Sequence, residues 1–484
     1  MAISASTLRL EPEALWRRFL ELTTIPRPSK QEAAARDHIL AWAHGRSFPV
    51  AVDAAGNVVV RVSASPGRES APTVCLQAHL DMVCERDPLS PHDAREGRIR
   101  VVREDDWLAA EGTTLGADNG IGVALALATA EDPSVEHGPL ELLFTVCEEQ
   151  GLEGAKGLDP ALLAARLLVN LDGTSDDAIT VGCAGSAHVV ARIPLERTEL
   201  HEGHGLVVEL AGGRGGHSGG DIHRGRANAI TALGRLLDQA RATAPIRLVE
   251  LAGGVSRNAI PREARAQLAL APRDEGAVRE AITNELARLR NEHASSDALT
   301  ATIRPERIGL AGSADATTRA LGLLRALPNG VVSFAAGLED VVETSTSLTV
   351  ARTEDGTLVL ASMARSSSGT GLEDIVTALE RVAAEHGAEV ESRRSYRPWE
   401  PDLDSSLLAA AQDAYRRLFG SEPRLEVVHG GLECAVIREK LPGVQMISLG
   451  PAILGPHAPG ERVSITGTQR VYALLKALLD DLSR

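Results

Sequence analysis

The stretch that decides the fold alternates short apolar runs with a helical pattern: TVCLQAHLD (73–81), GIGVALALATA (120–130), LELLFTVCEE (140–149) and ALLAARLLVNLD (161–172). Near-continuous apolar runs separated by helices are what a parallel sheet covered on both faces requires. The sequence therefore predicts an α/β fold with a mainly parallel sheet for this part of the chain.

The pattern changes downstream of this stretch. From about 188 to 390, alternating strand patterns such as TLVLASMAR (357–365) are joined to charged helices such as EGAVREAITNELARLRNE (275–292). A rhythm of helix followed by apolar strand then returns with LLAAAQDAYRRLFG (407–420). We therefore expect one discontinuous domain, at 1–187 and 391–484, interrupted by an inserted α+β domain at 188–390.

The composition excludes several classes of function. Acidic residues outnumber basic ones, 66 against 50, which gives a formal net charge of −16 at pH 7. Such a surface repels nucleic acids and anionic membranes but concentrates cations. The 484 residues include only 4 Trp, 3 Tyr and 5 Phe, too few for the stacking platforms that bind single-stranded nucleic acid. We therefore expect neither a nucleic-acid partner nor a membrane partner.

The cysteines and the N-terminus favour a cytoplasmic protein. The five cysteines are scattered and form no Cys-x-x-Cys pair, which argues against a disulfide framework and against a thiolate zinc site. Leu15, Phe19 and Leu22 share one face of a predicted helix with charges between them, unlike the core of a signal peptide. No apolar run approaches the ~20 residues of a membrane span. We therefore expect a soluble protein of a reducing compartment.

Metal-capable side chains follow the apolar runs, at the edge where open parallel sheets place their ligand sites. His79 and Asp81 close the first run and share a face of the strand, so Asp81 can hydrogen-bond the far nitrogen of a metal-bound His79. Glu148 and Glu149 follow the third run, and Asp172 ends the fourth. Paired acids also occur at solvated strand edges; in a metal site, one would ligate the ion and the other would transfer protons.

Two further candidates lie in loops. Asp118 lies in LGADNGIG (115–122), where the flanking glycines fit either a helix N-cap or a carboxylate that bridges two cations. His457 lies in GPHAPGERV (455–463), a loop stiffened by two prolines after another predicted strand. Two histidines with four or five carboxylates at one sheet edge suit zinc or a similar divalent ion, particularly a two-metal site that shares one carboxylate.

The inserted domain contributes two candidates. His217 lies in GGHSGGDIH (215–223), whose backbone can approach a ligand closely, although a simple turn has the same composition. Arg365 follows a strand pattern and fits bidentate binding of a carboxylate, with an exposed arginine as the alternative. The glycine-rich stretches lack the spacing of phosphate-binding loops, and G-x-S-x-G is absent. Neither a nucleotide enzyme nor a serine hydrolase is therefore expected.

The motifs occur along nearly the whole chain in the order found in one family. They are HLDMV (79–83), LGADNGIG, CEEQGLEGA (147–155), NLDG (170–173), GGHSGGDIH, SRNAIPRE (256–263), ALPNGV (326–331), GGLEC (430–434) and GPHAPGERV. In this the chain resembles the Xaa-His dipeptidases, also called aminoacyl-histidine dipeptidases or bacterial carnosinases, a branch of the di-zinc aminoacylase and carboxypeptidase superfamily. The resemblance implies a di-zinc catalytic domain at 1–187 and 391–484 and a lid domain at 188–390.

The resemblance also implies which residues hold the metals. Asp118 would bridge two divalent ions, zinc in the first instance, with manganese and cobalt as alternatives. His79 and Asp172 would complete one site, and Glu149 and His457 would complete the other. The metal pair would activate a water that attacks the scissile carbonyl.

Further roles carried over by the resemblance concern catalysis and substrate. Glu148 resembles the general base, and Asp81 the partner that orients His79. His217 resembles the lid histidine that stabilises the tetrahedral intermediate, so closure of the lid would accompany turnover. Arg365 and Asn258 match groups that face the C-terminal carboxylate or backbone of the substrate. The chain departs from the family pattern at Cys147, where a polar or acidic residue is expected, and in GTSDD (173–177), but neither change removes a ligand.

The function implied is metal-dependent hydrolysis of the amide bond in short peptides with a free C-terminus, such as carnosine and other Xaa-His dipeptides. An N-acyl-amino-acid deacylase or a tripeptidase would keep the same ligands and differ in the pocket. A non-catalytic binding protein on this fold would be expected to lose Glu148 or a ligand, and none is lost. The native metal, the preferred N-terminal residue and the choice between a monomer and a homodimer stay open.

Overall fold

The computed structural model describes residues 4–200, 203–336, 338 and 340–484. They form two compact units: unit 1 comprises Met1–Cys183, Pro401–Val427 and Leu432–Arg484, and unit 2 comprises Ala184–Glu400 and Val428–Gly431. These boundaries differ by a few residues from those predicted from the sequence, 187/188 and 390/391. The difference arises because β9 (Gly185–Pro194) and β21 (Glu389–Tyr396) pair with each other within the unit-2 sheet. Among the described residues, none of the helices combines the length and the apolar character that a membrane span needs.

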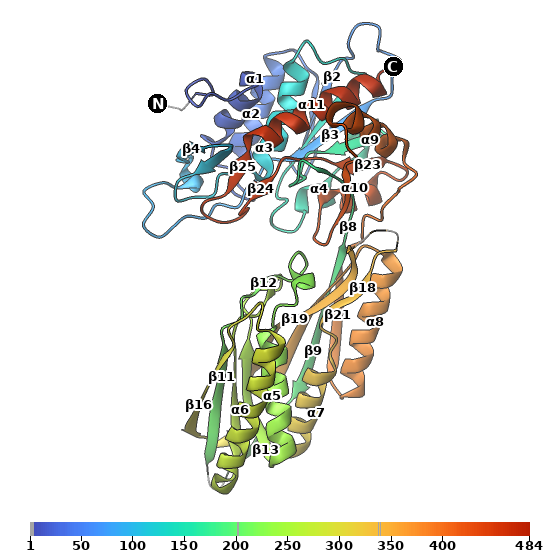
Figure 1. Ribbon diagram of the computed structural model, residues 1–484. Helices are drawn as coiled ribbons and strands as arrows, with labels where there is room; N and C mark the ends of the chain where they lie inside the picture. Colours follow the sequence, from blue (N-terminus) through green and yellow to red (C-terminus); the bar gives the residue numbers. More distant parts are fainter. Residues whose placement is uncertain (1–3, 201–202, 337, 339) are drawn as a thin grey trace. The chain divides into compact units, whose positions relative to one another are not determined.

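Unit 1 is built on an eight-stranded sheet in the order β1-β2-β6-β3-β7-β23-β8-β22 (Figure 1). The neighbouring strands β6, β3, β7 and β23 run parallel, whereas β8 pairs antiparallel with β23. The strands are β1 (Val50–Val52), β2 (Val58–Val62), β3 (Val74–His79), β6 (Leu140–Thr145), β7 (Leu167–Asn170), β8 (Ala178–Cys183), β22 (Arg424–Val428) and β23 (Gln445–Ser448). Every residue of β3 and β6 is buried, as expected for mainly apolar strands at the centre of a parallel sheet.

Helices cover this sheet. They are α1 (Glu13–Leu22), α2 (Ala33–His44), α3 (Ala117–Glu131), α4 (Glu153–Gly157), α9 (Ser406–Phe419), α10 (Glu433–Lys440) and α11 (Ile465–Leu482). The helix α3 packs against both β3 and α1, which explains why its sequence is apolar on nearly every side. A smaller sheet has the order β24-β25-β5-β4, made of β4 (Val101–Glu104), β5 (Trp107–Ala110), β24 (Ile453–Leu454) and β25 (Arg462–Ser464).

Unit 2 is an α+β layer. Its nine-stranded sheet has the order β16-β11-β15-β13-β19-β20-β9-β21, with β18 paired to β19. Besides β9 and β21, the strands are β11 (His204–Ala211), β13 (Ile246–Gly253), β15 (Ala264–Leu270), β16 (Thr300–Arg307), β18 (Gly330–Phe334), β19 (Val342–Glu354) and β20 (Thr357–Ser366). Two short pairs are β10 (Thr198–Glu199) with β17 (Leu310–Ala311), and β12 (Gly216–His217) with β14 (Ala259–Ile260).

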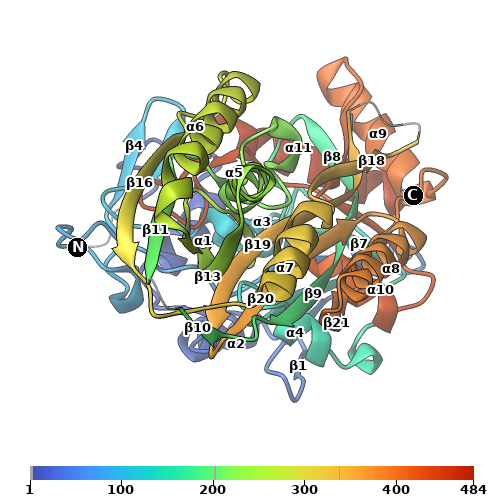
Figure 2. The ribbon, with the colours of Figure 1, turned by 90° about the horizontal axis from the view of Figure 1, so that it is seen from below.

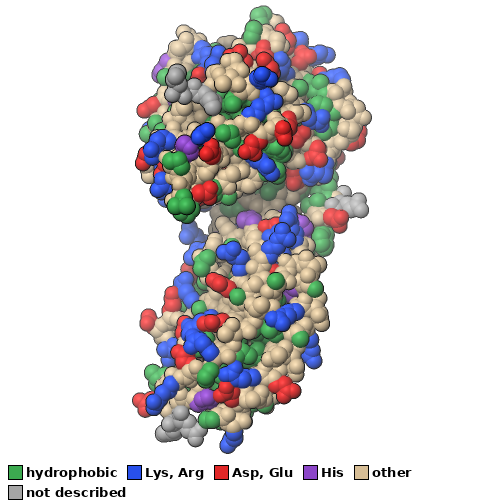
Figure 3. Space-filling view, turned by 60° about the vertical axis from the view of Figure 1, so that its left-hand side comes forward, with side chains coloured by type: hydrophobic (Ala, Val, Ile, Leu, Met, Phe, Trp, Pro, Cys, Tyr) green, Lys and Arg blue, Asp and Glu red, His purple; other side chains and the backbone are tan. Residues whose placement is uncertain are grey.

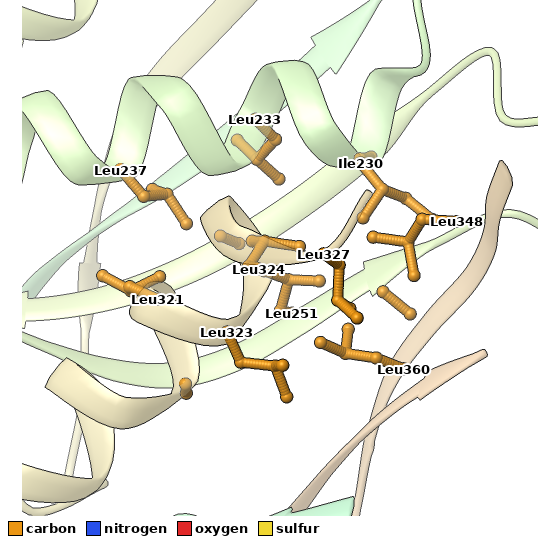
Figure 4. Packing of buried hydrophobic residues seen from close by; sticks show 14 of the residues in the cluster. Ile230, Leu233, Leu237, Leu251, Leu321, Leu323, Leu324, Leu327, Leu348 and Leu360 are labelled. Atoms are coloured by element: carbon orange, nitrogen blue, oxygen red, sulfur yellow. The ribbon is translucent and has the colours of Figure 1, made fainter. Parts of the chain in front are cut away.

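One face of the unit-2 sheet carries the helices α5 (Ala229–Thr243), α6 (Glu275–Glu292), α7 (Ala314–Ala326) and α8 (Gly369–Glu385), as Figures 1 and 2 show. Leucines dominate the core between them: in Figure 4, Leu233 from α5, Leu324 from α7 and Leu348 from β19 point toward one another. Asn228 and Ser313 cap the N-termini of α5 and α7 through their side chains. In the view of Figure 3, acidic and basic side chains are interspersed over each unit.

The predicted fold class is therefore confirmed. A domain with parallel strands at its centre is interrupted in sequence by an α+β unit, and the chain returns to place β23 inside the first sheet.

Candidate active site

The parallel strands of unit 1 end at one edge of the sheet, and several predicted ligands follow those ends. His79 is the last residue of β3. Glu148 and Glu149 follow β6, and Asp172 follows β7. Because parallel strands point the same way, their carboxyl ends bring these side chains together, as the sequence analysis expected.

Asp118, in the first turn of α3, lies between two histidines. Its Oδ1 is 3.0 Å from Nε2 of His79, and its Oδ2 is 3.2 Å from Nε2 of His457. Asp172 Oδ1 lies 3.6 Å from the same His79 nitrogen, and Glu149 Oε2 lies 2.9 Å from the same His457 nitrogen. The ligand-type atoms thus form two groups of three, each within 4.8 Å, and Asp118 belongs to both.

A third group overlaps these two. Ligand-type atoms of His79, Glu148 and Glu149 also lie within 4.8 Å of one another. Glu148 therefore stands beside the cluster without belonging to either group that contains Asp118. This position suits a carboxylate that reaches a water held at the cluster, and it leaves direct ligation by Glu148 as the alternative.

The cluster fits a pair of divalent cations. The Oε1 atom of Glu149 is buried and has no hydrogen-bond partner among the described residues. Burying an anionic oxygen without a partner is costly, and a bound cation would remove that cost. Imidazole and carboxylate donors together suit zinc, manganese and cobalt.

The pKa values of the carboxylates also favour a cation site. Burial, with a contribution from the charge of Asp118, raises the pKa of Asp172 to about 6. Burial also raises the pKa of Glu148 well above its usual value, and the nearby charge of Glu149 adds to that shift. For Asp118, burial acts in the same sense, but hydrogen bonds with His457 and His79 outweigh it and lower the pKa. Divalent cations would supply the positive charge that this crowding of acids lacks.

Asp81 orients His79 from the side opposite the cluster. Nδ1 of His79 lies 3.1 Å from the carbonyl oxygen of Asp81 and 3.4 Å from its Oδ1. The Asp81 carboxylate accepts hydrogen bonds from the Ser29 hydroxyl at 2.7 Å and from the backbone N–H groups of Glu148 and Glu149 at 2.9 and 3.2 Å. It therefore fixes the ring of His79 and ties the end of β3 to the turn after β6.

A buried arginine that the sequence analysis missed holds the backbone beneath this site. Arg27 is 1% exposed and donates from Nη1 to the carbonyls of Leu80 and Asp81, at 2.9 and 3.0 Å. Its Nη2 donates to the carbonyl of Gly116 at 2.5 Å. A Cβ on Gly116 or Gly120 would lie only 2.6 or 2.7 Å from that Nη2. The close approach of Arg27 thus explains two of the glycines in LGADNGIG.

Glu461, which was also not predicted from the sequence, binds the N–H groups of the same loop. Its Oε2 accepts from Leu115 and Gly116 at 2.8 and 2.9 Å, and its Oε1 accepts from Asp118 at 3.2 Å. Since Arg27 binds the carbonyl of Gly116 and Glu461 binds its N–H, the turn before Asp118 is fixed from both directions. Opposite charges on the two buried side chains favour this arrangement.

Glu433, in the motif GGLEC, had been given no role. It is 1% exposed and accepts hydrogen bonds from Gln77 Nε2 and Thr145 Oγ1, both at 2.6 Å. Gln77 in turn accepts from Asn170 Nδ2 at 2.6 Å, and Asn170 accepts from Ser448 Oγ at 2.5 Å. Burial raises the pKa of Glu433 to about 7. This network links β3, β6, β7 and β23 to α10 beneath the candidate ligands.

The remaining candidates lie in unit 2. His217 is exposed on β12, and its Nδ1 accepts a hydrogen bond from the Gly220 N–H at 2.9 Å, which fixes the ring. It pairs with Ala259 on β14, next to Asn258, whose carbonyl accepts from the Ser218 N–H at 2.8 Å. The structure thus places His217 and Asn258 side by side, on a different unit from the metal-type cluster.

Arg365 lies on β20 and is 3% exposed. Its Nη2 donates to Asn258 Oδ1 at 3.2 Å, and its buried Nε has no hydrogen-bond partner among the described residues. No carboxylate of those residues forms an ion pair with it. A buried guanidinium without a counter-charge is positioned to receive an anion.

The comparisons with known proteins agree with this chemistry. Residues 75–481 match the sequence model of Peptidase family M20/M25/M40. The chain is 36% identical over 480 residues to the cytosol non-specific dipeptidase of Escherichia coli (strain K12), covering 98% of both proteins. The crystal structure of aminoacylhistidine dipeptidase from Vibrio alginolyticus matches with a TM-score of 0.84 and 36% identity, covering 98% of this chain and 97% of that one.

A tripeptidase from Staphylococcus aureus shares the fold, with a TM-score of 0.58 and 17% identity, covering 98% of this chain and 99% of that one. The prediction that the chain is a metallopeptidase is confirmed by the family match and by the full-length relatives. The chain therefore belongs to the metallopeptidases of family M20/M25/M40.

Proposed function

We propose that this metal-dependent dipeptidase hydrolyses Xaa-His dipeptides with a free C-terminus, of which carnosine is an example. The aminoacylhistidine dipeptidase from Vibrio alginolyticus, similar over the full chain, supports the substrate class. We also propose a cytoplasmic location, supported by the name of the Escherichia coli relative.

In this proposal Asp118 would be shared by two divalent ions, zinc in the first instance. His79 and Asp172 would hold one ion, and Glu149 and His457 would hold the other, in keeping with the two groups of atoms that share Asp118. Such a pair, when bound, polarises the scissile carbonyl and lowers the pKa of a water towards neutrality.

The protein's own groups handle the proton and the developing charge. Glu148 takes a proton from the attacking water and delivers it to the leaving amine, a role that its place beside the two ligand groups allows. Asp81 keeps His79 in one orientation through Nδ1. His217, from unit 2, hydrogen-bonds the oxyanion of the tetrahedral intermediate.

The buried guanidinium of Arg365 is the observation that carries the preference for a free C-terminus. It has a neutral hydrogen-bond partner in Asn258 and no ion pair among the described residues. The C-terminal carboxylate of a peptide is a planar anion that accepts two parallel N–H donors from such a group. Binding this remote carboxylate would orient the amide bond for attack.

The first test compares dipeptides that differ only at the C-terminus. Gly-His and carnosine should be cleaved, and their C-terminal amides should be poor substrates. Arg365→Ala should raise KM for the free peptides by roughly 10- to 100-fold, because a hydrogen bond to a charged partner is lost, and should leave the amides little changed. Steady-state kinetics on the four peptides measure this effect.

Two outcomes would contradict the proposal. Equal rates on free and amidated peptides would show that the enzyme does not bind the C-terminal carboxylate through Arg365. Hydrolysis of N-acetyl amino acids without hydrolysis of dipeptides would favour the N-acyl-amino-acid deacylase instead.

A second test concerns His217. Removing one donor to an oxyanion lowers kcat by about 10²–10³-fold, so His217→Ala should be nearly inactive while its metal content stays unchanged. His223→Ala, which alters an exposed histidine of the same loop, should keep its activity and serves as the matched control. Full activity in His217→Ala would show that His217 has no catalytic role and that GGHSGG is only a turn.

A further inference from the structure

A second imidazole lies beside Arg365 in unit 2. His429 belongs to the segment Val428–Gly431, which packs with unit 2 although the chain on either side of it belongs to unit 1. Its Nε2 is 2.7 Å from the hydroxyl oxygen of Ser345 on β19. Ser345 is the direct cross-strand partner of Arg365 in the β19–β20 register, so the two side chains share a face of the sheet.

His429 and Arg365 also meet at Gly219, two residues after His217. A Cβ placed on Gly219 would lie 2.1 Å from the carbonyl oxygen of His429 and 2.9 Å from Cδ and Nε of Arg365. No side chain fits between them. The loop of His217, the segment of His429 and the strand of Arg365 therefore form one contact region within unit 2.

Polar atoms without partners gather in this region. Nδ1 of His429, Nε of Arg365 and Oγ of Ser218 are buried and have no hydrogen-bond partner among the described residues. Buried polar atoms in folded proteins are nearly always hydrogen-bonded, so a group of unpaired ones calls for a ligand. Because Arg365 is positively charged, we expect that ligand to be an anion.

We propose that His429 donates a hydrogen bond from Nδ1 to the C-terminal carboxylate of the substrate, alongside Arg365. This inference rests on the proposed function. When the Ser345 hydroxyl donates to Nε2, the neutral ring carries its proton on Nδ1. The Nδ1–H group donates to a carboxylate oxygen, whereas the NH₂ of a terminal amide is itself a donor and opposes it, so His429 adds selectivity for a free C-terminus.

The surroundings keep the ring neutral. Burial, followed by the nearby side chains of Arg365, His217 and His223, lowers the pKa of His429 to about 3 and outweighs the opposite effect of the Val342 backbone. His429 therefore acts as a fixed donor and adds no second full charge beside the guanidinium.

The experiment compares His429→Phe, which keeps a planar ring without a donor, with His429→Asn, which keeps an amide N–H. KM and kcat are measured on Gly-His and on its C-terminal amide, with thermal melting and metal content as checks of folding. His429→Phe should raise KM for Gly-His by roughly 10- to 100-fold, with kcat and the values for the amide little changed. His429→Asn should recover part of this loss.

Two controls separate local from general effects. Ser345→Ala removes the hydroxyl beside Nε2, so the ring of His429 can carry its proton on either nitrogen. This variant should raise KM for Gly-His by a smaller factor than His429→Phe. His293→Phe changes another histidine of unit 2, one whose Nδ1 lies 3.1 Å from the carbonyl oxygen of Gly225, and should leave both substrates unaffected.

The outcomes distinguish this inference from the function on which it rests. Equal losses on the free peptide and the amide in His429→Phe, or no loss on either, would overturn the inference alone, provided that Arg365→Ala behaves as proposed. A wild-type enzyme that does not distinguish Gly-His from its amide would overturn the proposed function, and this inference with it.

Discussion

Glu148→Gln is expected to lower kcat by about 10²–10⁴-fold while both metal ions stay bound, because the amide has the shape of the acid but cannot carry the proton. Glu148 belongs to neither of the two ligand groups that share Asp118, so its loss should leave those groups complete. The measurement is kcat at saturating metal, together with elemental analysis of the purified variant.

Glu149→Gln is the matched comparison, since the two residues are adjacent and the chemical change is the same. It should lose metal, because Glu149 lies in a ligand group with Asp118 and His457. Near-normal turnover in Glu148→Gln would assign proton transfer to another group. Loss of metal in Glu148→Gln would identify the group of His79, Glu148 and Glu149 as the true ligand set.

Asp118→Ala is expected to empty both metal positions and to abolish activity. Its two carboxylate oxygens face different histidines, Oδ1 toward His79 and Oδ2 toward His457, so one substitution removes a ligand from each ion. His79→Ala, which touches one group containing Asp118, should release mainly one ion. Elemental analysis after removal of metal by a chelator and reconstitution with zinc measures the difference.

The comparison between these two variants is the informative part. If Asp118→Ala still bound two ions tightly, Asp118 would not bridge them. If His79→Ala and Asp118→Ala lost the same amount of metal, the two positions would fill only together.

The sequence contained enough information to predict much of the candidate ligand cluster because three of its members mark the ends of parallel strands. His79, Glu149 and Asp172 each follow a run whose apolar character identifies a buried parallel strand, and parallel strands end on one side. The predicted positions are therefore brought together by topology, and the structure places ligand-type atoms of Asp172 and of Glu149 each within 4.8 Å of one from His79. That they bind metal stays a prediction.

The supporting residues were not predictable in the same way. Arg27 contacts carbonyls 53 and 89 residues along the chain, and Glu461 contacts N–H groups more than 340 residues away. No local pattern announces that an arginine or a glutamate will be buried, since most are exposed. Only the three-dimensional contacts reveal these residues.

One segment of unit 2 was not predicted from the sequence, for a related reason. The segment Val428–Gly431 lies between a strand and a helix of unit 1, and its sequence resembles an ordinary glycine-rich connection. Its association with unit 2 depends on the contact of His429 with Ser345 and the fit of Gly219 against its backbone. Neither contact has a signature in the sequence, so the role proposed for His429 emerged only from the structure.

The place of β23 between β7 and β8 bears on how the protein is made. Both neighbours leave the ribosome before Ala184, but β23 follows only after the whole of unit 2. At about 5–20 residues per second, synthesis of Ala184–Glu400 takes roughly 10–40 s. During that time the facing edges of β7 and β8 have no strand to pair with and are open to wrong partners. Unit 2 can fold first, and a nascent chain that still lacks His457 cannot assemble the candidate ligand cluster.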